Sequence, residues 1–210
     1  MAYRYSVHHI HHIGSRRIPG MEKIPNFNQM KQMKSTPAIF VITGAESTGK
    51  SAMAEWLANH FNVPYIPEFA RNYIEHLNRP YTSGDVEIIA STQVKEINEY
   101  KNSNYPFIFV DTWLIITKIW FEVVYGESPL WLENEIKNSK ICMFLVCDID
   151  LPWVPDPVRE NGGQKRKMLQ KRYIKTIEKY GFDYKIISGH NSERFENALK
   201  SVEDKINKLT

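Results

Sequence analysis

The chain carries a glycine-rich motif that fits the pattern GxxxxGK[ST], made of Gly44-Ala45-Glu46-Ser47-Thr48-Gly49-Lys50-Ser51. An apolar run at 38–42 precedes it, and a segment with helical spacing at 50–61 follows it. A turn of this kind at a helix N-terminus directs several backbone N–H groups at one point, where the helix dipole adds positive potential. The motif therefore predicts a strand, a phosphate-binding loop and a helix, and a nucleoside triphosphate as ligand.

Each part of the loop has an expected role. Gly44 and Gly49 allow backbone angles that a Cβ would forbid, and Lys50 can reach the β- and γ-phosphates as a point charge. The Ser51 hydroxyl is placed to bind Mg²⁺. We expect all eight residues to contact the nucleotide, with ATP and Mg²⁺ as the cofactors.

Apolar strands and helices alternate along the rest of the chain. Further strands are expected at 63–66, 107–110, 141–146 and 184–187, and further helices at 69–77, 85–101, 112–125, 164–180 and 192–208. Continuous apolar strands separated by helices indicate a parallel sheet covered on both faces. We expect an α/β fold of the P-loop NTPase and nucleoside-kinase type, in three layers, with a five-stranded parallel sheet.

Charge divides the chain into two parts. Residues 1–36 hold six Lys or Arg and one Glu, a balance of +5, whereas the whole chain has +3, which leaves −2 for residues 37–210. We interpret 1–36 as a flexible basic leader and 37–210 as one kinase domain. A domain near neutrality has no broad electrostatic surface for nucleic acid, so we expect no nucleic-acid partner.

The leader also contains four of the seven histidines, at 8, 9, 11 and 12. Interrupted His pairs without a Cys or carboxylate companion make a poor metal site, so we favour a leader or an over-long gene start over metal binding. An organellar presequence is the other alternative, but a clear amphipathic stripe is missing.

The two cysteines, Cys142 and Cys147, lie five residues apart in one expected strand, which predicts that they face opposite sides of the sheet and do not pair. The sequence has no secretory signal and no apolar stretch near the roughly 20 residues of a membrane span. We therefore expect a cytoplasmic protein with no membrane partner.

Asp111 ends the strand at 107–110, where P-loop proteins keep an acid that holds Mg²⁺ or its water shell. An ordinary helix N-cap is the alternative role for this residue. Thr112 follows in place of the glutamate that motor ATPases use to polarise an attacking water, which makes hydrolysis less probable as the main reaction.

Glu68 and Arg71 follow the second strand on the opening turn of a helix, at the expected edge of the cleft. Glu68 could accept a proton from a substrate hydroxyl or hydrogen-bond to it, and Arg71 could bind a phosphate or orient Glu68. The alternative is an exposed salt bridge between the two side chains, three residues apart on a helix.

The segment 148–163 is long and interrupted by prolines, which indicates a lid over the nucleotide. Closure would bring Arg159, with Lys165 or Arg166 as further candidates, against the charge on the transferring phosphoryl group. The alternative for the basic run at 165–172 is a solvated helix face. Trp153 could stack on a flat ring or serve as a packing anchor.

These pieces together resemble the ribosylnicotinamide kinase domain of NadR-type proteins over about 37–205. The resemblance rests on the phosphate loop and on the segments 67–71, 110–112, 120–126, 148–161 and 189–194, together with Gln93. It implies transfer of the γ-phosphate of ATP to the 5′-hydroxyl of nicotinamide riboside. By the same resemblance Glu68, Arg71 and Gln93 line the acceptor side, Asp111 serves the metal or the hydroxyl, and Arg159 belongs to the lid.

Two features depart from the family pattern. Many relatives have Asp-Thr-Asp where this chain has Asp111-Thr112-Trp113, so a task shared by two acids falls on Asp111 or Glu68. The leader is also too short for the nucleotidyltransferase or DNA-binding domain of full-length relatives, so we expect neither activity. A regulatory P-loop ATPase acting on a protein, and a kinase for another nucleoside, remain the alternative functions.

Overall fold

The computed structural model of the protein describes residues 36–155 and 161–209. Its strands are β1 (Ala38–Thr43), β2 (Tyr65–Ile66), β3 (Phe107–Asp111), β4 (Ile141–Cys147) and β5 (Tyr184–Ile187). Its helices are α2 (Lys50–Phe61), α3 (Phe69–Glu75), α4 (Ser83–Tyr100), α5 (Leu114–Tyr125), α6 (Leu130–Asn138), α7 (Gly163–Lys179) and α8 (Asn191–Leu209). The leader at 1–35 and Arg159 lie outside the described residues.

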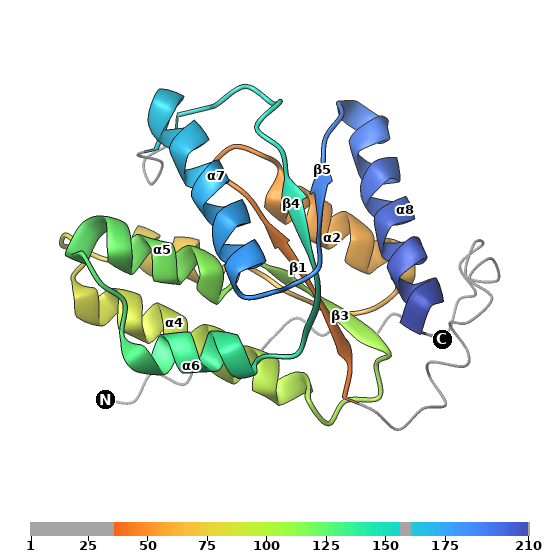
Figure 1. The fold of residues 1–210 in the computed structure, drawn as a ribbon, viewed down its shortest axis with the longest axis horizontal. Coiled ribbons are helices and arrows are strands. Elements are labelled where there is room, and N and C mark those ends of the chain that lie inside the picture. The colour runs from red at the N-terminus through yellow and green to blue at the C-terminus, as the bar shows by residue number, and fades with distance from the viewer. Residues whose placement is uncertain (1–35, 156–160, 210) are drawn as a thin grey trace.

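The strands form one five-stranded sheet in the order β2-β3-β1-β4-β5, and every pairing is parallel. Helices α4, α5, α6 and α7 cover one face and α2 and α8 cover the other (Figure 1). The expected three-layer α/β fold with a five-stranded parallel sheet is confirmed. In this order β1 lies between β3 and β4, so the phosphate loop leaves the middle of the sheet, with Asp111 on one side and the loop after Cys147 on the other.

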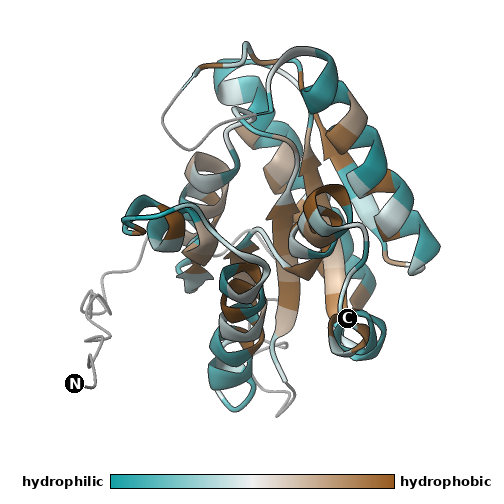
Figure 2. Cartoon of the chain, turned by 90° about the vertical axis from the view of Figure 1, so that its left-hand side faces the viewer, coloured by the Kyte–Doolittle hydropathy of each residue, from teal (hydrophilic) through white to brown (hydrophobic). Residues whose placement is uncertain are grey.

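Two apolar clusters hold the layers together because side chains alternate between the two faces of each strand. On β1, Val41 packs in the cluster under α4, α5, α6 and α7, whereas its neighbours Phe40 and Ile42 pack in the cluster under α2 and α8. Figure 2 shows the apolar strands between helices whose outer faces are polar. The sheet is buried on both sides, so the carboxyl ends of its strands are fixed relative to one another.

Two local features differ from the sequence-based expectations. Helix α6 was not expected, since Pro129 and the short amphipathic run after it gave no periodic signal of the usual length. The cysteines do not separate onto opposite faces: Cys147 is buried in the α2 and α8 cluster, and Cys142 packs against the same cluster. The register between β1 and β4 shifts by one residue at Cys142, and such a bulge reverses the alternation. Both cysteines are free.

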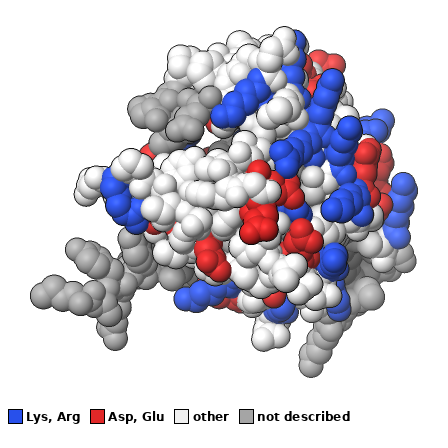
Figure 3. Space-filling view, turned by 60° about the vertical axis from the view of Figure 1, so that its left-hand side comes forward, with Lys and Arg blue, Asp and Glu red and all other residues white. Residues whose placement is uncertain are grey.

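Figure 3 brings the α7 side of the molecule forward and shows Lys and Arg side chains gathered in its upper half, with Asp and Glu side chains beside them. Most basic side chains of α7 are exposed, as expected for a solvated helix face, but Arg166 is buried. Within the part of the chain that the structure describes, no helix combines the length and apolar character needed to cross a bilayer.

Candidate functional site

The phosphate loop joins β1 to α2 and depends on two glycines. Gly44 has a φ of 137°, and a Cβ on it would lie 2.6 Å from the backbone oxygen of Cys147, so only glycine fits. Gly49 has a φ of 77° at the residue before α2. The loop is therefore held close to the end of β4 and turns sharply into the helix, which leaves the N-terminus of α2 free to meet an anion.

Two buried arginines hold the loop from behind. Arg166 of α7 donates from Nε to the backbone oxygen of Glu46 at 2.8 Å and from Nη2 to that of Ser47 at 3.1 Å. Arg194 of α8 donates from Nη2 to the backbone oxygen of Thr48 at 3.0 Å. Because the N–H and C=O of a trans peptide point in opposite directions, carbonyls drawn toward these arginines direct the N–H groups to the other side, where a phosphate would bind.

Gln170 of α7 joins the loop to the sheet. Its Oε1 accepts the Ala45 N–H at 2.8 Å, and its Nε2 donates to the Cys147 backbone oxygen at 2.9 Å. Gln170 is 4% exposed, and both ends of its amide are satisfied, as a buried amide requires. The loop and the end of β4 are thus fixed as one unit by α7.

Lys50 and Ser51 are the first two residues of α2, on the cavity side of the loop. The Lys50 Nζ donates to the Ala45 backbone oxygen at 3.1 Å, which folds the ammonium back over the loop. The Ser51 hydroxyl lies close enough to the Asp111 carboxylate to lower the pKa of that acid. The sequence-predicted Lys50, Ser51 and Asp111 therefore meet at one point, although they come from two strand ends.

Burial raises the pKa of Asp111 to about 6, and the Glu68 carboxylate adds to the rise, whereas the Ser51 hydroxyl and the charge of Lys50 oppose it. Asp111 is 2% exposed, and its Oδ1 is buried without a hydrogen-bond partner. A buried carboxylate oxygen without a donor, next to a serine hydroxyl, fits the oxygen-rich coordination of Mg²⁺. In the described part of the chain, no cluster of three or more His, Cys, Asp or Glu side chains offers another metal site.

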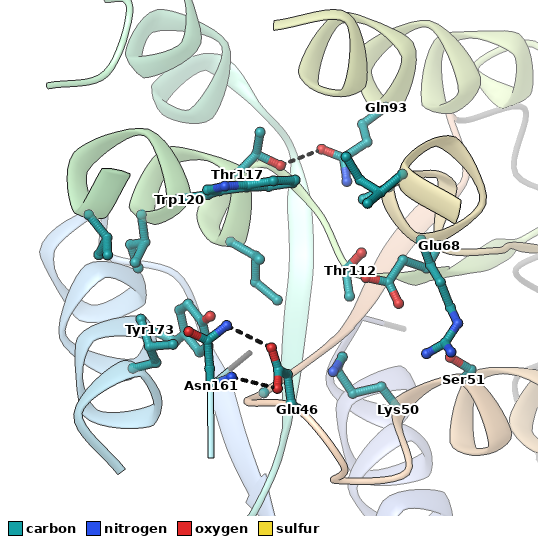
Figure 4. A pocket seen from close by; sticks show the side chains of 18 of the residues that line it. Glu46, Lys50, Ser51, Glu68, Gln93, Thr112, Thr117, Trp120, Asn161 and Tyr173 are labelled. Carbon is teal, nitrogen blue, oxygen red and sulfur yellow. Dashed lines mark hydrogen bonds between the residues drawn. The ribbon is translucent and has the colours of Figure 1, made fainter. Parts of the chain in front are cut away.

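A cavity of about 500 Å³ opens in front of the loop. Its wall combines the loop with residues from α3, α4, α5 and α7, and Figure 4 shows Lys50 at one end and Gln93 at the other. Gly44 and Glu68, which follow β1 and β2, line this cavity together with Thr112, whereas Asp111 at the end of β3 does not.

The acceptor-side candidates occupy different positions in this wall. Glu68 is the N-cap residue of α3 and lines the cavity, with its carboxylate directed toward Thr112 (Figure 4). Arg71 also lines the cavity. Among the described residues its ion pair is with Glu75, one turn along α3, at 2.9 Å, and not with Glu68, the alternative partner considered from the sequence. The cavity thus has a carboxylate near the phosphate loop and a guanidinium on the same helix.

The far end of the cavity lies between α4 and α5. Gln93 of α4 accepts a hydrogen bond from the Thr117 hydroxyl of α5 at 2.8 Å, and both side chains are buried. Trp120 lies beside them and stacks edge to face on Tyr81 at a centroid distance of 4.9 Å. Gln93, chosen from the family resemblance, is therefore a wall residue. Thr117 and Tyr81 carried no sequence signal, because they reach the cavity only through the packing of α4 against α5.

Trp153 does not belong to the cavity wall in the described part of the chain. Its ring packs over Gly162, and its Nε1 donates to the Glu46 carboxylate at 3.2 Å. Asn161 donates to the same carboxylate from Nδ2 at 2.6 Å and from its backbone N–H at 3.0 Å. Stacking of Trp153 on a substrate ring is therefore not supported, and the alternative role as a packing anchor describes its contacts.

The two basic residues considered as further lid candidates, Arg166 and Lys165, take different positions in the structure. Arg166 points behind the phosphate loop, where all its hydrogen bonds go to backbone oxygens, so it is wrong as a candidate for the transferring phosphoryl group. Lys165, its neighbour on α7, is exposed and lines the cavity.

Trp113, which stands where many relatives have the second Asp of Asp-Thr-Asp, does not line this cavity. The Trp113 side chain is 3% exposed, packs against Phe144 and lines a second cavity beside the amino ends of β1 and β4. Thr112 lines the main cavity instead and has a φ of 64°, a strained angle for a β-branched residue. Strain of this kind concentrates at functional sites, and no sequence pattern predicted it.

The family model AAA_28, an AAA domain, matches residues 39–194. The chain belongs to this family. The expected likeness of this AAA_28 protein to NadR-type proteins is also confirmed. The "Trifunctional NAD biosynthesis/regulator protein NadR" of Escherichia coli (strain K12) is 25% identical over 148 residues, which cover 68% of this chain and 36% of the relative. The chain thus matches little more than a third of that protein's length.

Solved structures support the fold of this AAA_28 protein. A crystal structure of a NadR protein in complex with NR has a TM-score of 0.66 at 18% identity and covers 82% of this chain and 50% of that one. A thymidylate kinase from Candida albicans has a TM-score of 0.61 at 13% identity and covers 84% of this chain and 94% of that one. At these identities the comparison shows the fold, which is that of P-loop nucleoside and nucleotide kinases.

Proposed function

We propose that residues 37–210 form an ATP-dependent kinase that phosphorylates the 5′-hydroxyl of nicotinamide riboside, giving nicotinamide mononucleotide. The observation that carries the proposal is one cavity with a phosphate loop at one end and a buried amide and an aromatic wall at the other. A NadR structure bound to NR is among the similar folds. In a cavity of this kind, a phosphate donor bound at one end can meet a nucleoside bound at the other.

The residues divide between donor and acceptor. Lys50 and the N–H groups of residues 44–51 would hold the triphosphate, and Ser51 with Asp111 would hold Mg²⁺, which neutralises charge on the β- and γ-phosphates when bound. Glu68 is the group best placed to orient the 5′-hydroxyl, because it lines the cavity, whereas Asp111 lies behind Ser51. We therefore assign the metal to Asp111 and the hydroxyl to Glu68.

The reaction is an in-line transfer. The 5′-oxygen forms a bond to the γ-phosphorus, the bond from the γ-phosphorus to the bridging oxygen breaks, and the hydroxyl proton passes to the Glu68 carboxylate. The negative charge that leaves with ADP is stabilised by Lys50 and the loop amides. Lys165 lies where it can approach the transferring group, and Arg159 stays a candidate for the same role. Catalysis would consist mainly of positioning and charge neutralisation.

ATP consumption measured with and without nicotinamide riboside tests the proposal. Wild type should consume ATP only when the riboside is present, and Lys50→Ala should lose at least about a hundredfold in turnover while keeping its thermal unfolding temperature. Lys167→Ala, which removes an exposed lysine of α7, is the matched control and should behave as wild type. ATP consumption without a nucleoside would instead favour a regulatory ATPase, and preference for another nucleoside in a panel would reassign the acceptor.

A further inference from the structure

We propose that the far end of the cavity selects nucleosides whose base carries a carbonyl oxygen, and that Thr117 sets this preference by fixing the amide of Gln93. The inference rests on the proposed kinase function, because it concerns the acceptor of the same site. It adds the group of the base that is recognised and a positioning residue, Thr117, that the family resemblance did not supply.

The polar pair at this end of the cavity is buried. Gln93 is 5% exposed and Thr117 is 2% exposed, and they lie 24 residues apart on two facing helices. The Thr117 hydroxyl donates to Gln93 Oε1 at 2.8 Å. Burying an amide and a hydroxyl is unfavourable unless they are hydrogen-bonded, so this contact holds both side chains in place.

The contact determines which end of the amide meets a ligand. With Oε1 turned to Thr117, the amide nitrogen of Gln93 lies on the cavity side (Figure 4). Within residues 36–155 and 161–209 this nitrogen has no hydrogen-bond partner, so its two N–H donors are available in the cavity. A ligand that offers an oxygen to this donor is favoured, because a ligand without an acceptor would cover the donor and leave it unsatisfied. The end of the cavity therefore recognises an acceptor, such as the carbonyl of a carboxamide or of a pyrimidine.

The aromatic wall defines the shape of this ligand. In Figure 4 the Trp120 ring is seen edge-on next to Thr117, so one ring face is turned toward the cavity. Tyr81 meets this ring edge to face, and Val123 and Val124 complete the apolar side. A flat heterocycle stacks well on such a face. Stacked there, it would bring an in-plane carbonyl substituent to the amide of Gln93.

A buried acid holds the loop that carries Tyr81. Asp85, at the start of α4, accepts from two nitrogens of Arg79 at 2.7 and 2.8 Å and from the Tyr73 hydroxyl at 2.9 Å. It also accepts from the N–H and the hydroxyl of Thr82. Arg79 and Thr82 flank Tyr81 in the sequence, so these contacts hold the loop that carries Tyr81.

The test compares two ribosides that differ by one carboxamide group: nicotinamide riboside and the pyridine riboside that lacks it. Wild type should prefer the first by at least about tenfold in kcat/KM, the effect of one hydrogen bond to a donor on the cavity wall. Thr117→Val should raise the KM for nicotinamide riboside and bring that preference close to one, with the KM for ATP unchanged. Thr117→Ser keeps the hydroxyl and should restore the preference. Thr176→Val removes a hydroxyl from α7 that bonds only to Arg172 O and should change neither constant.

The possible results test the carbonyl selection, the role of Thr117 and the kinase function separately. Equal efficiency of the two ribosides in wild type overturns the carbonyl selection while the kinase assignment stands. A Thr117→Val enzyme that folds and keeps the wild-type preference overturns the role of Thr117 alone. A preference for cytidine over uridine would show that the amide presents its oxygen to the base, and would overturn the proposed orientation. If no nucleoside is phosphorylated, the proposed function fails and this inference fails with it.

Discussion

The Arg194 guanidinium donates to the backbone oxygen of Thr48 at 3.0 Å, a contact across 146 residues that ties the last helix to the phosphate loop. The same side chain donates to the backbone oxygen of Asp148 at 2.8 Å and forms an ion pair with Asp150 at 2.5 Å. One buried arginine therefore sets the positions of the phosphate loop and of the segment after β4 together.

Replacing this arginine should disturb both stability and nucleotide binding. Arg194→Ala leaves the backbone oxygens of Thr48, Asp148 and Gly189 without this donor and removes the ion-pair partner of Asp150. Loss of the donor to buried acceptors typically removes about 1–3 kcal/mol of unfolding free energy. Lys205→Ala, on the same helix, removes only the outward-facing pair with Asp183 and should change stability by less than about 1 kcal/mol. Urea unfolding gives the stabilities, and ATP titration gives the affinities. Equal stability losses in the two variants would contradict this account.

Two glycines offer a second test, because replacing one of them by alanine causes backbone strain alone, whereas replacing the other also causes a steric clash. Gly44 combines a φ of 137° with a Cβ position 2.6 Å from the Cys147 oxygen, whereas Gly126 has a φ of 90° and nothing within 4 Å of its Cβ position. Gly126→Ala should lose about 1–2 kcal/mol of unfolding free energy from strain alone and keep full nucleotide affinity.

Gly44→Ala carries the same kind of strain and must also displace the end of β4 from the loop. We expect a larger stability loss than in Gly126→Ala and no measurable nucleotide binding at concentrations that saturate wild type. Isothermal titration with the magnesium nucleotide checks the binding. A Gly44→Ala protein that binds nucleotide as wild type does would show that the loop tolerates the displacement.

The sequence predicted the fold well because the relevant signals are local. The strand before Gly44, the acid at the end of β3 and the alternation of apolar strands with helices all lie within short windows of the chain. Parallel pairing then forces the strand ends to one edge of the sheet. The positions of Glu68 and Lys50 in one cavity follow from that topology.

The remainder of the site depends on long-range packing. Arg166 resembled any other cation of a basic helix, and only the packing of α7 against the sheet turns it behind the loop, unlike Lys165. Thr117 resembled a core threonine until α4 and α5 brought it to Gln93. The register shift at Cys142 likewise has no local signal, since it depends on pairing with β1. Such features follow from the tertiary fold, so they cannot be predicted from short patterns in the sequence.

The support of Tyr81 leads to a prediction about the acceptor alone. Asp85→Asn removes the charge that pairs with Arg79 and loosens the loop that carries Tyr81. The KM for the nucleoside should rise by about tenfold, since small displacements of positioning groups have effects up to about a hundredfold, and the KM for ATP should stay unchanged. Glu87→Gln, on the same helix, alters only the contact with Trp131 and is the control. Equal changes in both KM values would place the effect in the fold as a whole.

A buried acid outside the cavity wall predicts how stability depends on pH. Burial, and secondarily the neighbouring Glu99, raises the pKa of Glu96 from 4.5 to about 7. The Glu96 Oε2 is buried without a partner, which agrees with a carboxyl that is protonated in the native state at mildly acidic pH. Asp111 has a pKa raised to about 6, so its titration affects the lower part of the same window.

The sign follows from proton binding. Between pH 4.5 and 7 the native state holds a proton on Glu96 that the unfolded chain has lost, so the unfolding free energy falls as the pH rises through this window. Glu96→Gln should remove the fall between pH 6 and 7 and leave the variant more stable than wild type at pH 8, by about 1 kcal/mol, because the partial exposure of this side chain to water weakens the effect. Glu99→Gln should only reduce the fall, because it lowers one contribution to the shift. Urea unfolding from pH 5 to 8 measures all three proteins, and a slope in Glu96→Gln as steep as in wild type would assign the titration to another group.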